Sequence, residues 1–403
     1  MKCRFCSHDV HHEFIDLVNA PPSNAYLTVD QLDEPEVFYP LKVLVCEKCL
    51  LVQVDEYKKS DEIFDANYAY FSSMSSSWVE HARNYVEMIT DRQKLNSHSH
   101  VIEIASNDGY LLQFFQSKKI PCLGVEPTKS TADVARGKGI TIIEEFFGET
   151  LAGTLQKADV ILGNNVLAHV PNINDFVKGL KVALKADGVI TMEFPHLLNL
   201  IEKSQFDTVY HEHFSYLSLM TTMSVFKVHG LQIYDVEELA THGGSLRIYA
   251  THIENTISIA PQVKTVLQKE ISANLDKLEG YKGFQEKANR IKYDFLNFLL
   301  HAKSQNKKVI GYGAAAKGNT LLNYCGVKND LIDFVVDKAP LKVGKYLPGS
   351  HIPIVMEENI KELKPDFVVI FPWNIKEEII HQLDYIKEWG GQFVVAIPRL
   401  EIL

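Results

Sequence analysis

The stretch VIEIASNDG, residues 101–109, decides the fold of the central part of this chain. It reads as a buried strand that runs into a turn of small residues, and helical spacing follows over 111–116. In a Rossmann-like fold such a turn lets the backbone approach a ligand. An acidic residue at the end of the next strand then accepts hydrogen bonds from the ribose hydroxyls of that ligand. Glu126 follows the apolar run 122–125 and is placed for that role.

The turn departs from the G-x-G-x-x-G pattern, because only Gly109 is present. This argues against a dinucleotide pyrophosphate and favours a nucleoside ligand without one, and S-adenosylmethionine fits. Glu103 would lie near its amino-acid end, although it could instead be an ion-paired strand residue. The candidate cofactor-binding residues are Glu103, Ala105, Ser106, Asn107, Gly109, Glu126 and Asn164.

Strands and helices alternate around this turn, which predicts βαβ units and a parallel sheet. A helix is expected behind the polar SSMSSS stretch, with Trp78, Ala82, Tyr85, Val86 and Ile89 on one face. Two later strands lack a crossover helix between them and suit an antiparallel edge pair. The predicted strands are 101–105, 122–125, 140–143, 160–163, 189–194, 231–239 and 245–251.

Three domains are predicted for the 403 residues: 1–75, 76–255 and 256–403. Residues 1–75 are interrupted by prolines and show few runs longer than a short strand such as 41–45. The last domain begins with one long amphipathic helical stretch over 262–304 and continues as a second, smaller α/β unit. The expected fold class is thus α/β, with a small N-terminal module and two Rossmann-like units.

Two C-x-x-C motifs, Cys3-x-x-Cys6 and Cys46-x-x-Cys49, lie in the N-terminal segment and are called the two clips below. Four thiolates placed two by two match a tetrahedral structural zinc site, which leaves no open position for catalysis. Two pairs of reduced thiols, or redox-active dithiols, are the alternatives. A bound metal would also supply the stability that so small a core lacks.

The net charge of −10 gives no electrostatic footprint for nucleic acid or for an anionic membrane. No uncharged apolar run approaches 18 residues, and the N-terminus has no apolar leader pattern. We therefore expect a cytoplasmic protein that binds a small molecule, and we expect a monomer.

A second turn, Gly311-x-Gly313-x-x-Ala316, has Asp337 at the end of the next strand. This pattern suggests an NAD site, as in a sugar dehydrogenase. The helix that begins at this turn also has an N-terminus that suits any diphosphate, with Lys317 and Asn319 beside it. A third possibility is that the glycines only allow a tight turn for close packing. Trp373 and Asn374 end a later strand and could face the same anion.

The run YHEHFSY, residues 210–216, follows the last parallel strand of the first sheet, and ligands of such sheets bind at this edge. A neutral histidine with an adjacent carboxylate is a good general base near neutral pH. His169 and His196 are expected on the same rim, although a single histidine is more often structural. Tyr68 and Tyr70 could reach over the sheet as a lid, or could pack between domains. The run contributes Tyr210, Glu212 and His213 as candidates.

The order of motifs resembles the nucleotide-sugar C-3'-methyltransferases over essentially the whole length. The motifs are the two clips, EIASNDG at 103–109, YHEHFSY at 210–216, HGGSLR at 242–247 and GYGAAAKGN at 311–319. The resemblance implies a zinc-binding module, a central S-adenosylmethionine-dependent fold and a C-terminal domain that holds a nucleotide diphosphate instead of NAD.

The resemblance also implies roles for single residues. His213 matches the family's catalytic histidine, with Tyr210, Glu212 and His169 nearby, and Tyr70 is preferred over Tyr68 as the lid tyrosine. The expected reaction is methylation at C3 of a dTDP- or GDP-linked 4-keto-6-deoxy sugar. A non-catalytic, zinc-containing ligand sensor is the remaining alternative. The candidate substrate-binding residues are His196, His242, Gly313, Lys317, Asn319, Trp373 and Asn374.

Overall fold

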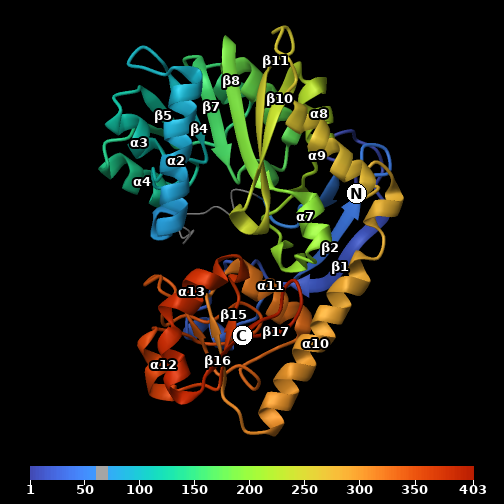
Figure 1. Ribbon diagram of the computed structural model, residues 1–403, viewed down its shortest axis with the longest axis vertical. Helices are drawn as coiled ribbons and strands as arrows, with labels where there is room; N and C mark the ends of the chain where they lie inside the picture. The colour runs from blue at the N-terminus through green and yellow to red at the C-terminus, as the bar shows by residue number, and fades with distance from the viewer. Residues whose placement is uncertain (60–70) are drawn as a thin grey trace.

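The computed structural model describes residues 1–59 and 71–403 and is drawn in Figure 1. Tyr68 and Tyr70, the two predicted lid tyrosines, lie outside the described residues. Within the described part the strands form sheets of four, seven and six strands. The predicted fold class is confirmed: a small N-terminal module precedes two α/β units. No helix of the described residues is long and apolar enough to cross a membrane.

The N-terminal sheet is antiparallel and has the strand order β1-β2-β3-β9. β1 was not predicted, because Val18 adopts a positive φ of 67° and irregular register there hides the alternation of side chains. β9 belongs to the YHEHFSY run, so this run is joined directly to the Cys-containing module. The strands are β1 (His12–Ala20), β2 (Tyr39–Val45), β3 (Val52–Val54) and β9 (Ser215–Tyr216).

The central sheet has the order β10-β11-β8-β7-β4-β5-β6. The five strands from β8 to β6 are parallel, and β10 and β11 form the predicted antiparallel edge pair. Parallel strands bring their carboxyl ends to one edge, where the predicted ligand turns lie. The strands are β4 (Val101–Ile104), β5 (Cys122–Val125), β6 (Ile142–Ile143), β7 (Ala158–Asn164), β8 (Leu184–Pro195), β10 (Leu231–Leu239) and β11 (Ser245–His252).

Helices cover both faces of this sheet (Figure 1). α2 (Ser76–Gln93) buries the five residues predicted for its apolar face, and the Ser75 hydroxyl caps it by accepting from the Trp78 amide. The remaining helices of this unit are α3 (Leu112–Ser117), α4 (Lys129–Gly137), α5 (Glu149–Ala152), α6 (Ile173–Ala183), α7 (Leu197–Glu202) and α8 (Leu219–Val228), with short 3-10 turns η3 (Leu167–His169), η4 (Phe206–Thr208) and η5 (Thr241–Gly243).

The linking stretch is two helices and not the single long helix expected from its amphipathic pattern. α9 (Pro261–Ser272) packs on β10 and α8 of the central unit, whereas α10 (Phe284–Ser304) packs on β1 and α11 (Ala316–Cys325). Gly283, at φ +80°, turns the chain immediately before α10. The exact domain boundary near residue 255 stays a prediction, since α9 packs with the central unit.

The C-terminal sheet has the order β14-β13-β12-β15-β16-β17 and is parallel except for its last strand. Its elements are β12 (Val309–Tyr312), β13 (Val335–Val336), β14 (Ile354–Val355), α12 (Glu358–Leu363), β15 (Phe367–Ile370), η7 (Trp373–Ile375), α13 (Lys376–Gln382), η8 (Asp384–Trp389), β16 (Gln392–Val395) and β17 (Glu401–Ile402).

The loop between β1 and β2 reaches the C-terminal sheet. The Tyr26 hydroxyl donates to the Ala314 carbonyl at 2.6 Å, and the Asn319 amide donates to the Ser23 carbonyl at 2.5 Å. This loop therefore brings residues of the N-terminal module to the turn that follows β12.

Candidate active site

One cavity of about 760 Å³ joins the carboxyl edge of the central sheet to the turn after β12. Its walls come from the central unit, from the C-terminal unit and from the loop after β1. It brings together eleven of the predicted site residues: Ala105, Asn107, Glu126, Asn164, His169, Tyr210, Glu212, His213, His242, Lys317 and Asn374.

The turn after β4 forms one end of this cavity. Ala105 and Asn107 both adopt positive φ, at 55° and 50°, which draws the backbone tightly around the turn. The buried Glu126 carboxylate accepts from the Asn107 and Thr128 amides, each at 2.9 Å, and lines the cavity. Each carboxylate oxygen keeps a further acceptor site, so Glu126 fits a ribose hydroxyl.

Three predicted cofactor residues lie behind this wall and not on it: Glu103, Ser106 and Gly109. Glu103 is fully buried, and its carboxylate oxygens have no hydrogen-bond partner among the described residues. Burial, with Asp108 and Glu126 nearby, raises the pKa of Glu103 well above its usual value. Gly109 lies against Ile140, where a Cβ atom would come within 2.4 Å of its side chain. These three residues shape the turn from behind.

An aromatic wall of three residues that were not predicted for the site, Trp78, His81 and Tyr110, lies beside the predicted His242. Trp78 stacks on His81 with ring centroids 4.9 Å apart, and it also contacts Tyr110 and His242. All four residues line the cavity. The helical pattern had placed Trp78 only in the core, and His81, one turn further along α2, was the available signal that this face also borders a cavity.

His213 is held with one ring nitrogen fixed. Its Nδ1 lies 3.0 Å from the Thr208 carbonyl oxygen, and Nε2 has no hydrogen-bond partner among residues 1–59 and 71–403. The rings of Tyr210 and His169 lie 4.0 and 4.6 Å away, centroid to centroid. Burial lowers the pKa of His213 well below its usual value and lowers that of His169 to about 4. Both imidazoles are therefore neutral at pH 7.

Glu212, the residue before His213, is buried and is held from the N-terminal module. The Asn24 amide donates to its Oε1 at 2.7 Å, and both residues line the cavity. Burial raises the pKa of Glu212 to about 7, although Asn24 acts in the opposite direction. Asn24 was not predicted, because nothing local in the sequence shows that the loop after β1 reaches this point.

Two histidines point elsewhere. His211 Nε2 donates to the Pro40 carbonyl at 3.1 Å, so it faces the N-terminal module. His196 was expected on the rim, but its Nε2 lies 2.7 Å from buried Glu270 on α9, and it does not line the cavity. The expectation failed because the partner lies on a helix far along the chain, and His196 fits a structural role.

The C-terminal end of the cavity carries the cationic groups. Lys317 donates to Asn374 Oδ1 at 2.7 Å, and burial lowers the pKa of Lys317 to about 8. Lys342, which was not predicted, lines the cavity as well. A helix N-terminus with two ammonium groups fits a diphosphate.

Three other predicted substrate residues lie outside the lining: Asn319, Gly313 and Trp373. Asn319 is buried against Ser23, and Gly313 lies against Pro372. Trp373 donates its indole N–H to Asp207 Oδ2 at 2.7 Å. They support the cavity wall from behind.

The four clip cysteines form one group. Their Sγ atoms all lie within 4.8 Å of one another, and the closest pairs, Cys3 with Cys49 and Cys6 with Cys46, are 3.5 Å apart. A disulfide needs about 2.05 Å, whereas sulfurs around a tetrahedral zinc lie about 3.8 Å apart. The Gln53 amide donates to Cys3 Sγ at 3.3 Å, which suits a thiolate ligand. The donor set fits structural zinc.

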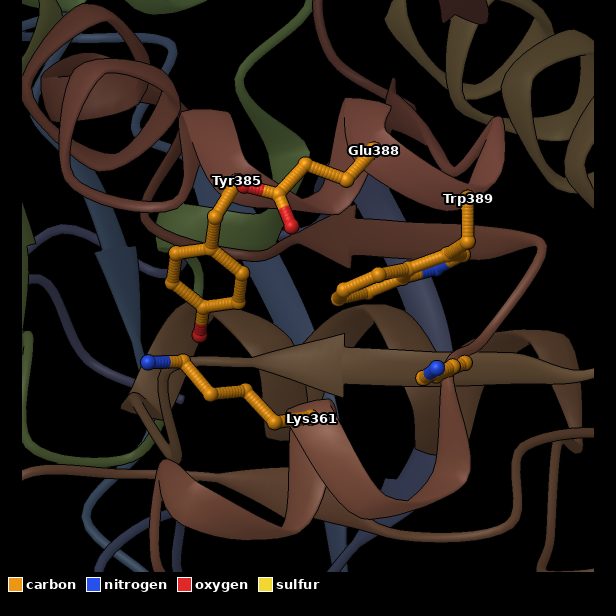
Figure 2. A pocket seen from close by; sticks show the side chains of 5 residues that line it. Lys361, Tyr385, Glu388 and Trp389 are labelled. Carbon is orange, nitrogen blue, oxygen red and sulfur yellow. The ribbon is translucent and has the colours of Figure 1, made fainter.

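A second, open cavity of about 350 Å³ lies between α12 and η8 (Figure 2). It is lined by Lys361, Lys364, Tyr385, Glu388 and Trp389, and none of the predicted site residues is among them. The Lys361 ammonium lies 4.7 Å from the centre of the Tyr385 ring. Figure 2 shows these two side chains on one side of the cavity.

Three family models together span most of the chain. Residues 3–64 match a candidate zinc binding domain, 78–236 match a methyltransferase domain, and 240–398 match a C-methyltransferase C-terminal domain. The fold and the site therefore define an S-adenosylmethionine-dependent C-methyltransferase with a zinc-binding module.

A curated relative extends this likeness to the full length. The chain is 32% identical to the C-methyltransferase NovU of Streptomyces niveus over 406 aligned residues, covering 100% of this chain and 96% of NovU. The chain belongs to the sugar C-methyltransferase family.

Solved structures resemble only part of the chain. The magnesium protoporphyrin IX methyltransferase of Synechocystis PCC 6803, solved with bound SAM, is 13% identical, with a TM-score of 0.35; the match covers 43% of this chain and 79% of that one. A methyltransferase of Clostridium acetobutylicum ATCC 824 is 10% identical, with a TM-score of 0.36. This match covers 43% of this chain and 92% of that one. The family assignment does not depend on them.

Proposed function

We propose that this enzyme methylates C3 of a nucleoside-diphosphate-linked 4-keto-6-deoxy sugar, with His213 as the general base. The observation that carries the proposal is the fixed tautomer of His213. Because the Thr208 carbonyl can only accept, Nδ1 carries the proton and Nε2 keeps its lone pair, on a ring that lines the cavity.

The base has a substrate proton that it can remove. A ketone at C4 acidifies the hydrogen on C3, so the C3–H bond breaks as the proton moves to Nε2. The electron pair is delocalised into the ketone, and an enolate forms with negative charge on O4. Tyr210 and His169 lie against the base and are proposed to stabilise O4. Tyr70, or in its place Tyr68, stays a proposed lid residue.

Glu126 and Asn107 would hold S-adenosylmethionine, which would supply an activated methyl group to the C3 carbon and leave as S-adenosylhomocysteine. The chain's own contribution is to position the two reactants, since an oriented pair reacts far faster than a free pair. Asn164, at the end of β7, lines the cavity between the two ends and is proposed to bind the cofactor. His242 is proposed on the substrate side, where it accepts from Asn165 at 2.7 Å.

Lys317 and Asn374, with Lys342, are proposed to hold the diphosphate. The YHEHFSY run contributes Tyr210, Glu212 and His213 to the same cavity that Glu126 and Lys317 line. A sugar nucleotide whose diphosphate is bound at Lys317 would bring its ketone into the cavity that His213 lines.

An NAD-dependent oxidoreductase is the rival, and the turn after β12 disfavours it. Asp337 would have to accept from the NAD ribose, but it does not line the cavity. The Lys342 ammonium lies 3.5 Å from its Oδ2, in addition to the Ala314 and Ala339 amides that donate to it at 2.8 Å. The Ala314 carbonyl accepts hydrogen bonds from the Tyr26 hydroxyl and the Lys342 ammonium. The turn is thus filled by the protein's own groups.

The proposal is tested by incubating the purified protein with S-adenosylmethionine and a panel of dTDP- and GDP-linked 4-keto-6-deoxy sugars. We expect mass spectrometry to show one methyl gained by at least one sugar nucleotide. Separate titrations with NAD and S-adenosylmethionine distinguish the rival, because NAD binding alone would contradict the proposal.

A further inference from the structure

The segment just before the YHEHFSY run is held by the C-terminal unit. Trp373 donates its indole N–H to Asp207 Oδ2 at 2.7 Å. On α11, the Thr320 hydroxyl donates to the Val209 carbonyl at 2.8 Å. Residues 206–209 are therefore fixed by two side chains of the C-terminal unit.

The same segment fixes the base. Thr208, the neighbour of Asp207, supplies the carbonyl that accepts from His213 Nδ1 at 3.0 Å. Asp207 and Thr208 are joined by one rigid peptide unit, so a change in the position of Asp207 would shift Thr208 and, with it, the carbonyl oxygen that Thr208 presents to His213. The orientation of the His213 ring thus depends on how Asp207 is held.

Trp373 also borders the cationic end of the cavity. The Lys317 ammonium lies 4.4 Å from the centre of the Trp373 ring and donates to Asn374, the next residue along the chain. A ligand that moves Lys317 or Asn374 therefore acts on the residue that holds Asp207.

The buried position of Asp207 is energetically unfavourable for a carboxylate. The residue is 1% exposed, and its second oxygen, Oδ1, has no hydrogen-bond partner among the described residues. A buried carboxylate with an unmatched oxygen destabilises a fold, so packing alone does not explain an acidic residue here. Lys317 is the charged group that acts on it from the cavity side.

We propose that Asp207 is a positioning residue which, through Trp373, couples diphosphate binding at Lys317 and Asn374 to the orientation of His213. This inference rests on the proposed function, in which His213 is the base and the diphosphate lies at Lys317. Binding energy from the remote nucleotide would then be used to align the base, and its loss lowers kcat more than it raises KM.

The test compares Asp207→Ala and Trp373→Phe with the matched variant Asp207→Asn, which keeps an acceptor oxygen for the indole. The first readout is nuclear magnetic resonance of ¹⁵N-histidine-labelled protein without substrate, with His213 assigned by its absence in His213→Gln. We expect the Nδ1–H tautomer in wild type and in Asp207→Asn, and mixed tautomers in the other two variants.

The second readout is steady-state kinetics. We expect kcat to fall about 10–100-fold in Asp207→Ala and Trp373→Phe, as for a base displaced by up to about 1 Å, with the Kd of S-adenosylmethionine unchanged. Asp207→Asn should restore most of the rate. An unchanged His213 tautomer in both Asp207→Ala and Trp373→Phe, or an equal loss of rate in Asp207→Asn, would overturn the inference. Since the tautomer is read without substrate, it decides whether Asp207 positions His213 even if no sugar nucleotide is methylated.

Discussion

His213 Nδ1 lies 3.0 Å from the carbonyl oxygen of Thr208, and this contact determines which nitrogen of the ring is basic. The neighbouring His211 donates to the Pro40 carbonyl and faces away from the cavity. Two histidines in one short run are thus oriented toward different parts of the molecule, which provides a matched pair for experiment.

His213→Gln should lower the rate of methyl transfer by about 10²–10⁴-fold, since this is the usual contribution of a general base. Binding of S-adenosylmethionine, measured by calorimetry, should be unchanged because Glu126 and Asn107 are untouched. His211→Gln is the control and should keep most of the rate. Near wild-type turnover in His213→Gln would remove His213 from the role of base.

Glu212 should determine how kcat falls on the acid side of its pH profile. Burial raises its pKa to about 7, and its ionised form would stabilise the imidazolium that forms on His213. The rate should therefore fall as pH drops through about 7, while His213 itself, with a pKa held well below 6.5, stays neutral there.

Two variants check this assignment by the pH dependence of kcat. Glu212→Gln should abolish this fall near pH 7. Asn24→Ala should move it to higher pH, because the lost hydrogen bond stabilised the charged form. A wild-type profile that is flat between about pH 6 and 8 would be incompatible with this role for Glu212.

Glu126 should hold the cofactor. Glu126→Ala removes a buried charged acceptor that lines the cavity, and the Kd of S-adenosylmethionine should rise about 10–100-fold. Glu103→Gln is the matched control, because Glu103 lies behind the same turn and outside the lining. Equal losses of affinity in the two variants would show that Glu126 has no direct part in binding.

The metal site should stabilise the N-terminal module and, through the pairing of β3 with β9, the YHEHFSY run. Metal analysis of protein purified without chelator should give about one zinc per chain. Cys46→Ser should lose the metal and lower the melting temperature, whereas Cys122→Ser, outside the cluster, should retain it. Less than about half an equivalent of zinc would contradict this site.

Much of the fold was predictable because strand and helix periodicities are local. β5 and β10 have the predicted bounds, and α2 buries the predicted face. The two-residue strand β9 was missed, since its partner Val52 lies far away in the chain and two residues carry no periodicity. The break between α9 and α10 was missed because an amphipathic pattern continues on both sides of it.

The candidate site likewise has residues that the local sequence predicts and residues that only tertiary contacts reveal. His213, Glu126 and Lys317 follow strands or turns that the sequence marks, and all three line the cavity. Asn24 was missed because its approach to Glu212 depends on tertiary contacts of a long loop. His196 was placed wrongly, since its position after a strand end says nothing of Glu270 on α9.

The central claim is that C3 of the sugar loses its hydrogen and gains a methyl group. The most direct measurement is mass spectrometry of the product formed from S-adenosylmethionine and freshly prepared 4-keto-6-deoxy sugar nucleotides, dTDP- and GDP-linked, that carry deuterium at C3. We predict a product that has gained one methyl group and lost the deuterium. A methylated product that retains the deuterium, or no methyl gain with any sugar of the panel, would contradict the account.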